Sequence, residues 1–141
     1  MSMGKWTDEA RRMKPYIQKG AQSLTDQEAS FVPTLYGGMA YDGSLIESGT
    51  KINWKGSLKR AAVDLWDTED NNPDRAPDLW EDILYRDGIR IIPETITAGT
   101  FFVKDELGWW GDDLYKSVYD GQNVWTPEQY PAGWVSMEDG A

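Results

Sequence analysis

The 141-residue sequence contains no cysteine and no histidine. The chain therefore forms no disulfide and no thiolate or imidazole zinc site, and it has no Ser-His or Cys-His catalytic pair. Pairs of carboxylates remain as candidate catalytic groups. A sequence repeat described below predicts two very small folded units, and units of that size are not expected to form the cleft in which two acids hydrolyse a glycosidic bond. We expect a protein that is not an enzyme and that needs no cofactor and no metal.

Long apolar runs and basic residues are also scarce. There is no run of eighteen apolar residues, and the N-terminus lacks the layout of a secretory signal. Lys and Arg number 14 against 24 Asp and Glu, which gives a formal net charge of −10, and residues 87–141 alone contribute −7. An acidic surface repels phosphate backbones and anionic lipids. We therefore expect neither nucleic acid nor membrane as a partner, whereas a neutral polysaccharide is compatible.

Phenylalanine is rare, with three residues, whereas the chain has eight Trp and seven Tyr. Trp and Tyr combine a large apolar ring with a polar edge, and they are favoured at half-wet surfaces and binding sites. This aromatic balance favours a binding module over a plain hydrophobic core.

A rare sequence frame occurs twice. Pro73, Pro77 and Trp80 follow the pattern Pro-x-x-x-Pro-x-x-Trp, and residues 127–134 repeat it 54 positions later. Each proline fixes φ near about −65° and favours an extended residue before it, so the segment is stiff and delivers its Trp to a set place. We interpret the frame as part of a duplicated module in which Trp80 and Trp134 each close a small core.

Short apolar runs separated by turn residues predict β-strands in both copies. A further alternating segment, residues 85–93, is predicted to be a strand that joins the copies. The predicted strands are residues 50–54, 58–65 and 80–84 in the first copy, and residues 100–103, 107–110, 114–119 and 134–137 in the second copy.

The N-terminal segment has helix signals. Thr7 followed by two acids predicts the start of a helix that ends at Gly20 and that Pro15 kinks or shortens. Thr25 and Glu28 form a capping-box pattern that predicts a short second helix ending before Pro33. Such a helical hairpin is too small to be stable alone, so we expect it to pack on the repeats or on another subunit.

The sequence thus predicts a mainly β fold with an N-terminal α-helical hairpin and two small tandem antiparallel β modules of about three short strands each. We place the hairpin in residues 1–36, the first module in residues 37–86 and the second module in residues 87–141.

Two resemblances suggest a biological setting. The turn, aromatic strand, polar loop and Trp-Thr-Pro of residues 99–135 resemble the small chitin-binding modules of bacterial chitinases, carbohydrate-binding families five and twelve, and residues 49–83 match more loosely. Residues 19–29, followed by such a module, resemble small proteins encoded beside phage and prophage tail-fibre genes of Gram-positive bacteria. The resemblance implies a tail-region accessory protein of the virion, made in the host cytoplasm without a signal peptide.

The candidate ligand-binding residues are Trp66, Trp109, Trp110, Tyr119 and Trp125. In the resembling modules an aromatic pair just after the hairpin faces the sugar, and Trp66 and Tyr119 lie near that place. Trp125 lies beside the polar loop of residues 120–123. One residue of the Trp109-Trp110 pair must point outward on a strand, either as a sugar platform or as packing for the helical hairpin.

We expect these aromatics to hold a bacterial or environmental surface glycan, as in receptor binding. The expected partners are this polysaccharide and other phage structural proteins, and we expect a homo-oligomer. The alternative is a structural virion component, a decoration or tail protein, whose aromatics are buried in protein interfaces.

Overall fold

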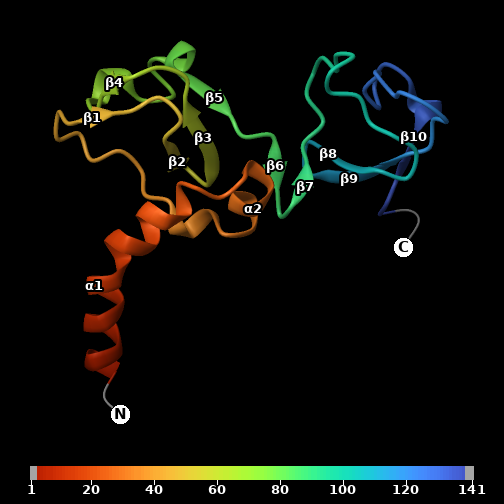
Figure 1. The fold of residues 1–141 in the computed structure, drawn as a ribbon. Helices are drawn as coiled ribbons and strands as arrows, with labels where there is room; N and C mark the ends of the chain where they lie inside the picture. Colours follow the sequence, from red (N-terminus) through yellow and green to blue (C-terminus); the bar gives the residue numbers. More distant parts are fainter. Residues whose placement is uncertain (1–2, 139–141) are drawn as a thin grey trace. The chain divides into compact units, whose positions relative to one another are not determined.

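The structure, a computed structural model, describes the backbone of residues 3–138 and the side chains of residues 9–138 (Figure 1). The chain divides into two compact units, the first ending at Ile83 and the second beginning at Leu84. Both are built from small antiparallel sheets, and the α-helices α1 and α2 belong to the first unit. The predicted mainly β fold with N-terminal helices is confirmed.

The first unit begins with α1 (Met3–Ala21), α2 (Asp26–Phe31) and the 3-10 helix η1 (Pro33–Leu35). The predicted capping box is confirmed, because the Thr25 hydroxyl accepts from the Glu28 amide at 3.1 Å and the Glu28 carboxylate accepts from the Thr25 amide at 3.0 Å. The predicted start at Thr7 is wrong, because α1 already begins at Met3. Extending a formed helix costs less than starting one, and α1 also continues past Pro15.

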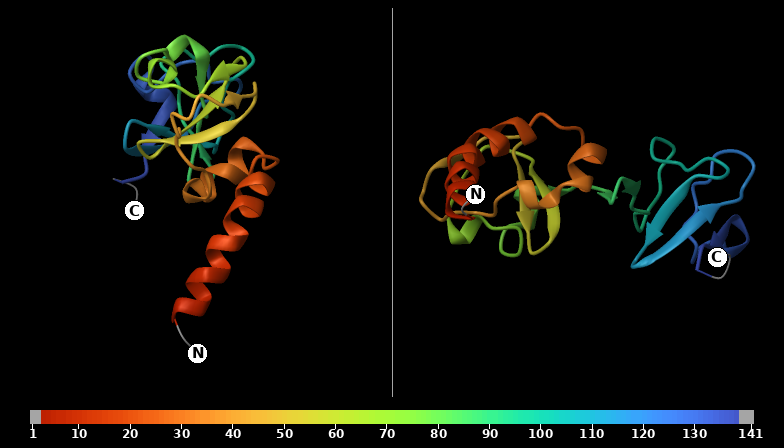
Figure 2. Two further views of the ribbon diagram at one scale, coloured as in Figure 1. Left: turned by 90° about the vertical axis from the view of Figure 1, so that its left-hand side faces the viewer. Right: turned by 90° about the horizontal axis from the view of Figure 1, so that it is seen from below.

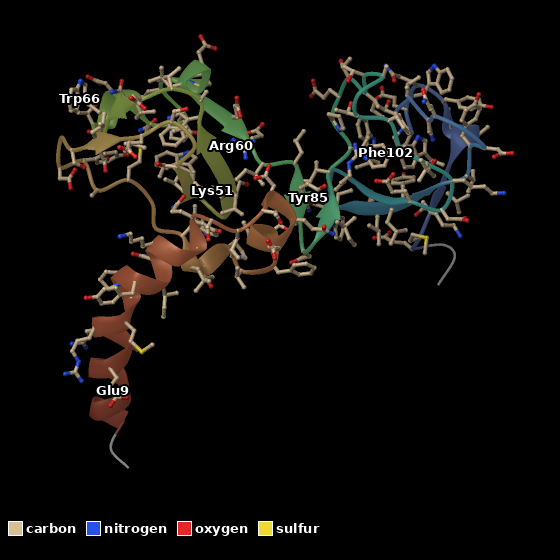
Figure 3. The ribbon with its side chains drawn as sticks, viewed as in Figure 1. Glu9, Lys51, Arg60, Trp66, Tyr85 and Phe102 are labelled. Carbon is tan, nitrogen blue, oxygen red and sulfur yellow. The ribbon has the colours of Figure 1, made fainter. Side chains whose placement is uncertain are left out.

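The end of the helical segment is bonded to the first sheet. The Gln22 side chain accepts from the Lys51 amide at 2.7 Å and donates to the Lys51 carbonyl at 2.9 Å, as a neighbouring strand would. Asp26 forms a 2.7 Å ion pair with Arg60 (Figure 3). The helical segment therefore packs on the repeat that follows it, which is one of the two expected partners.

The first unit contains one three-stranded sheet and one strand pair. In the sheet, β3 (Ser57–Ala61) lies between β2 (Lys51–Trp54) and β5 (Trp80–Asp82), and beside it β1 (Leu45–Ile46) pairs with β4 (Leu65–Trp66). Between β4 and β5 lie two short 3-10 helices, η2 (Glu69–Asn71) and η3 (Pro77–Leu79). The core consists of Ile46, Ile52, Ala61, Leu65 and Trp80.

The second unit repeats this sheet. Its central strand β9 (Asp113–Ser117) lies between β8 (Leu107–Trp110) and β10 (Trp134–Ser136), and η4 (Pro131–Gly133) precedes β10 (Figure 2). The core consists of Ile92, Ile96, Phe102 and Trp134.

Two predicted strands of this region are wrong in detail. Residues 85–93 form a hairpin of β6 (Tyr85–Arg86) and β7 (Ile89–Arg90), because Asp87 and Gly88 both have positive φ and make the turn. Residues 100–103 pair with another segment only through the isolated bridge from Phe102 to Asn123.

The duplication seen in the sequence is present in the hydrogen bonds of the two units. Trp80 donates from Nε1 to the Asn71 carbonyl at 2.8 Å, and Trp134 donates from Nε1 to the Trp125 carbonyl at 2.7 Å. In each unit the donor lies nine residues after the acceptor. Trp80 is 7% exposed and Trp134 is 5% exposed, so the prediction that they close the two cores is confirmed.

The two cores fill the same space with different residues. Ile52 is the second residue of β2, and its counterpart in β8 is Gly108. A Cβ at Gly108 would lie 2.6 Å from Ile92 Cγ1 and 3.0 Å from Phe102 Cε2. Phe102 stands at the position of the smaller Ile46, because Phe102 lies six residues before Gly108 and Ile46 lies six residues before Ile52. The missing side chain at Gly108 is therefore compensated by a larger ring and by an isoleucine from the segment after β7.

Candidate functional site

Three aromatic rings meet at the surface of the second unit. Tyr119 and Trp125 lie 5.3 Å apart between ring centroids, Trp125 and Tyr130 lie 5.7 Å apart, and Tyr119 and Tyr130 lie 6.2 Å apart. All three pairs are edge-to-face, the favoured geometry for interacting rings. Trp125 and Tyr130 are each 39% exposed. We call these three residues the aromatic cluster.

A buried asparagine holds the loop that carries the cluster. Asn123 is fully buried, and its Nδ2 donates to Ser117 Oγ at 3.0 Å and to the Gly133 carbonyl at 3.1 Å. Its Oδ1 accepts from the Trp125 amide at 3.3 Å. A buried amide that loses these partners costs free energy, so the loop is held in one conformation.

The position of Tyr130 depends on a missing side chain. A Cβ at Gly133 would lie 2.9 Å from Tyr130 Cδ2, so the ring occupies the place that a side chain would take. In the first unit Leu79 stands at the position of Gly133, and Ala76 stands at the position of Tyr130. The second unit has thus exchanged a large residue for glycine and a small residue for tyrosine, and the exchange brings the tyrosine ring into the cluster.

The turn between Trp125 and Tyr130 is capped at both ends. The Gln129 amide donates to Thr126 Oγ1 at 3.1 Å, and the Thr126 amide donates to Gln129 Oε1 at 2.9 Å. Thr126 is 1% exposed, whereas Glu128 and Gln129 are exposed. The turn is therefore rigid and presents a carboxylate and an amide to solvent.

These two polar side chains line an open depression of about 450 Å³, which we call the acidic hollow. Trp110, at the end of β8, supplies its aromatic wall, and it also packs against the core. The segment 125–130 contributes residues to both features: Trp125 and Tyr130 belong to the aromatic cluster, and the three residues Thr126, Glu128 and Gln129 line the hollow. The lining residues are Glu94, Trp110, Thr126, Glu128 and Gln129.

Trp109 lies on the other face of β8 and is used within the unit. Its Nε1 donates to the Arg86 carbonyl at 2.9 Å, and the Arg86 guanidinium carbon lies 4.8 Å from its ring centroid. The Trp109 carbonyl also accepts from the Ile92 amide at 2.7 Å. The ring thus packs on the β6–β7 hairpin and connects it to the sheet.

Trp66 belongs to the first unit, on the short strand β4 (Figure 3). It is 60% exposed and lies directly opposite Leu45, which is 49% exposed. At the three positions that correspond to the aromatic cluster, the first unit has Val63, Asn71 and Ala76. The first unit therefore has an exposed Trp but no counterpart of the cluster.

Of the five predicted ligand-binding residues, the structure brings Tyr119 and Trp125 together and places Trp110 in the adjacent hollow. Tyr130 and the two glutamates of the hollow are absent from the prediction. The sequence does carry a signal for Tyr130, because it replaces Ala76 of the first copy within the same Pro-x-x-x-Pro frame. Their roles in binding remain predictions.

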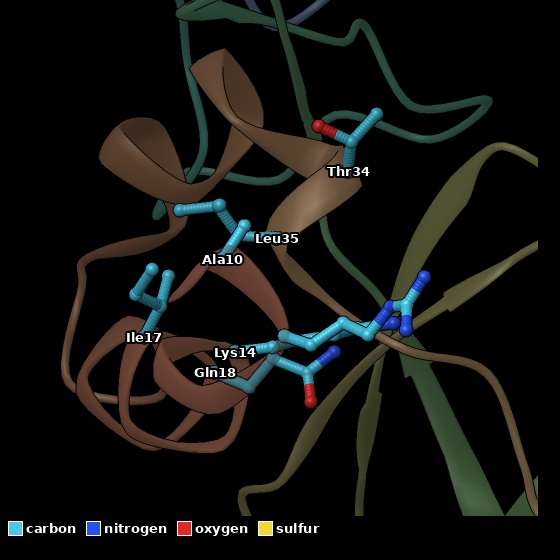
Figure 4. A pocket seen from close by; sticks show the side chains of 7 residues that line it. Ala10, Lys14, Ile17, Gln18, Thr34 and Leu35 are labelled. Atoms are coloured by element: carbon cyan, nitrogen blue, oxygen red, sulfur yellow. The ribbon is translucent and has the colours of Figure 1, made fainter. Parts of the chain in front are cut away.

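A second depression, of about 330 Å³, lies between α1 and η1 (Figure 4). Its wall is mostly apolar, and three large side chains of the helical segment are also exposed: Met13 at 57%, Tyr16 at 78% and Phe31 at 63%. The lining residues are Ala10, Arg11, Lys14, Ile17, Gln18, Thr34 and Leu35.

Among the described side chains of residues 9–138, no three acidic groups gather where they could hold a metal ion. No helix in the described part of the chain is long and apolar enough to cross a membrane. Comparison with protein-family models gives no match, and comparison with curated proteins gives no significant match.

Proposed function

We propose that this chain is a non-enzymatic glycan-binding protein whose principal site is the aromatic cluster of the second unit with the adjacent acidic hollow. The observation that carries the proposal is the cluster itself. Tyr119, Trp125 and Tyr130 are three partly exposed rings on a loop held by buried hydrogen bonds, and the duplicated first unit has no aromatic residue at these positions.

The chemistry of a sugar suits this arrangement. A pyranose has apolar C–H faces and a rim of hydroxyl groups, so stacking it on an exposed ring removes apolar surface of both from water. Glu128 can accept hydrogen bonds from hydroxyl groups, and the Gln129 amide can donate them. Because the loop is already rigid, little conformational entropy is lost on binding.

We further propose that the protein works as a phage-type accessory component of the virion, close to the tail. The support is the resemblance of residues 19–29 and 99–135 to phage and carbohydrate-binding sequences. A single shallow site binds weakly, and its repetition on a particle would raise the overall affinity for a surface that displays many copies of a glycan.

The test combines a glycan array with a pull-down on purified Gram-positive cell walls. The wild-type protein is expected to bind. Trp125→Ala and Tyr130→Ala should each weaken binding at least about fivefold, because truncating an anchoring aromatic typically costs more than about 1 kcal/mol. Trp66→Ala, which removes an exposed Trp from the other unit, is the matched control. A folded wild-type protein that binds no glycan and no wall would refute the proposal.

A second candidate function is assembly through the helical segment. The exposed side chains of Met13, Tyr16 and Phe31 and the apolar depression between α1 and η1 (Figure 4) favour a protein partner. Sedimentation equilibrium measures the mass of the protein in solution. A homo-oligomer that Met13→Glu with Tyr16→Glu dissociates would support this role, and a strict monomer at high concentration would count against assembly between copies.

A further inference from the structure

The first unit contains an ammonium group bound between an aromatic ring and a carboxylate. Lys55 Nζ lies 5.3 Å from the ring centroid of Trp54 and forms an ion pair with Asp74. The same carboxylate accepts from Trp54 Nε1 at 3.1 Å. A cation above an indole and beside a carboxylate is attracted by both.

Two of these three residues have counterparts in the second unit. Trp54 ends β2 and Trp110 ends β8, each just before the turn to the next strand. Asp74 and Glu128 each follow the first proline of the Pro-x-x-x-Pro frame. The residue that supplies the ammonium does not recur, because the position of Lys55 is taken by Gly111.

The acidic hollow is the place where these counterparts meet. Trp110 and Glu128 line it, and Glu94 adds a second carboxylate. No described lysine or arginine forms an ion pair with either glutamate. The second unit thus has the ring and the carboxylates of the cation site, without a side chain of its own to supply the cation.

The two arginines of the second unit are committed elsewhere. Arg86 lies against Trp109, on the opposite face of β8, and pairs with Asp112 at 3.2 Å. Arg90 pairs with Glu106 at 2.9 Å. The lining of the hollow contains two carboxylates and no basic residue, so its negative charge repels anionic ligands and attracts cations.

We propose that the acidic hollow binds a primary ammonium group of the ligand, in the place that Lys55 Nζ takes in the first unit, and that this group is the amine of a de-N-acetylated amino sugar. The proposal rests on the proposed glycan-binding function. It favours a sugar amine over a lysine of a protein partner because the hollow and the aromatic cluster take residues from the same segment, 125–130, so that neighbouring sugars of one chain can reach both.

The experiment compares two oligosaccharides of equal length, the glucosamine hexamer and the fully N-acetylated hexamer, by calorimetry at a pH where the amine is protonated. The wild-type protein is expected to bind the glucosamine hexamer about fivefold more tightly, because a charge pair at a solvent-exposed site contributes up to about 1 kcal/mol. Glu128→Gln and Glu94→Gln should each reduce this preference severalfold. Glu138→Gln makes the same change in charge at a residue that does not line the hollow, and it should keep the preference.

Gly111→Lys is the most specific variant, because it restores the residue that the first unit has. Gly111 has φ of 64° and Lys55 has φ of 54°, so the fold already holds a lysine in this backbone conformation. The new ammonium should occupy the hollow and remove the preference for the glucosamine hexamer. Affinity for the N-acetylated hexamer should stay within about twofold of the wild-type value.

The possible failures are distinguishable. If both hexamers bind equally and Trp125→Ala weakens both, the ammonium site is wrong and the glycan-binding function stands. If neither hexamer binds, a titration with butylammonium, followed at the indole signal of Trp110, decides between the two claims. A shift that Glu128→Gln abolishes leaves an ammonium site for a different ligand, and the absence of a shift overturns the site. Tighter binding of a trilysine peptide than of the glucosamine hexamer would overturn the sugar as the source of the amine.

Discussion

The indole nitrogen of Trp134 donates a 2.7 Å hydrogen bond to the backbone carbonyl of Trp125. Trp134 closes the core of the second unit, where its ring meets Phe102 edge-to-face at 5.2 Å. Trp125 belongs to the aromatic cluster at the surface. The residue that completes the core therefore also fixes the backbone of the residue that we propose as a sugar platform.

The first prediction removes this hydrogen bond. Trp134→Phe keeps an aromatic ring in the core but leaves the Trp125 carbonyl without its donor and the core with a smaller ring. We expect the free energy of unfolding of the second unit to fall by about 1–3 kcal/mol, measured by urea denaturation. Trp80→Phe, the matching change in the first unit, should have a similar cost but leave glycan affinity unchanged. An undiminished stability of Trp134→Phe would show that the indole bond contributes nothing.

The second prediction concerns the exchange of residues in the core. Gly108→Ala places a Cβ at 2.6 Å from Ile92 Cγ1, so the neighbouring side chains must move. Overpacking of this kind typically costs about 1–3 kcal/mol, and we expect a lower melting temperature of the second unit. Gly99→Ala is the control, because its Cβ would have its nearest neighbour at 3.9 Å. If both variants melt together with the wild-type protein, the proposed compensation at Gly108 is incorrect.

The third prediction tests how Tyr130 is positioned. Gly133→Ala should displace the Tyr130 ring, because the added Cβ would lie 2.9 Å from Cδ2. We expect glycan affinity to fall severalfold while the far-ultraviolet circular dichroism stays close to that of the wild type. Gly133→Ala combined with Tyr130→Ala gives the added Cβ the space of the ring, as Ala76 does beside Leu79 in the first unit, and should regain stability but not affinity. An affinity unchanged in the single variant would remove Tyr130 from the site.

The sequence predicted the duplicated frame, both core tryptophans and the exact range of β8, because Pro, Gly and Trp impose strong local constraints. It placed other boundaries less well. The β-prone composition of residues 100–103 predicts a strand, but the fold gives only Phe102 a bridge partner.

The site was less predictable than the fold. Tyr119 and Trp125 are six residues apart, and their contact depends on a loop conformation that the buried Asn123 fixes through three hydrogen bonds. The acidic hollow combines Glu94 with Glu128, which lie far apart in the sequence. No local pattern encodes such a meeting, although comparing the two copies residue by residue would have pointed to Tyr130 and Glu128.

The fourth prediction uses pH to test the ammonium site of the first unit. Hydrogen bonds from Lys55 and then from Trp54 hold the pKa of Asp74 below its ordinary value. The contribution of this carboxylate to stability is therefore present above its unfolded pKa and is lost as the pH falls through the lower folded pKa. We expect a side-chain NMR titration to give Asp74 a midpoint below that of an aspartate in an unfolded peptide, and Lys55→Met to raise it. A midpoint unchanged by Lys55→Met would contradict the contact.

The most direct measurement of the central claim is an NMR titration that follows the indole signals of the eight Trp residues while the strongest array-binding glycan is added. The proposed site predicts saturable shifts at Trp125 and Trp110, with the signals of Trp54 and Trp80 in the first unit unchanged. Saturable binding that shifts only Trp66, or that leaves Trp125 and Trp110 unmoved, would contradict the assignment of glycan binding to the second unit.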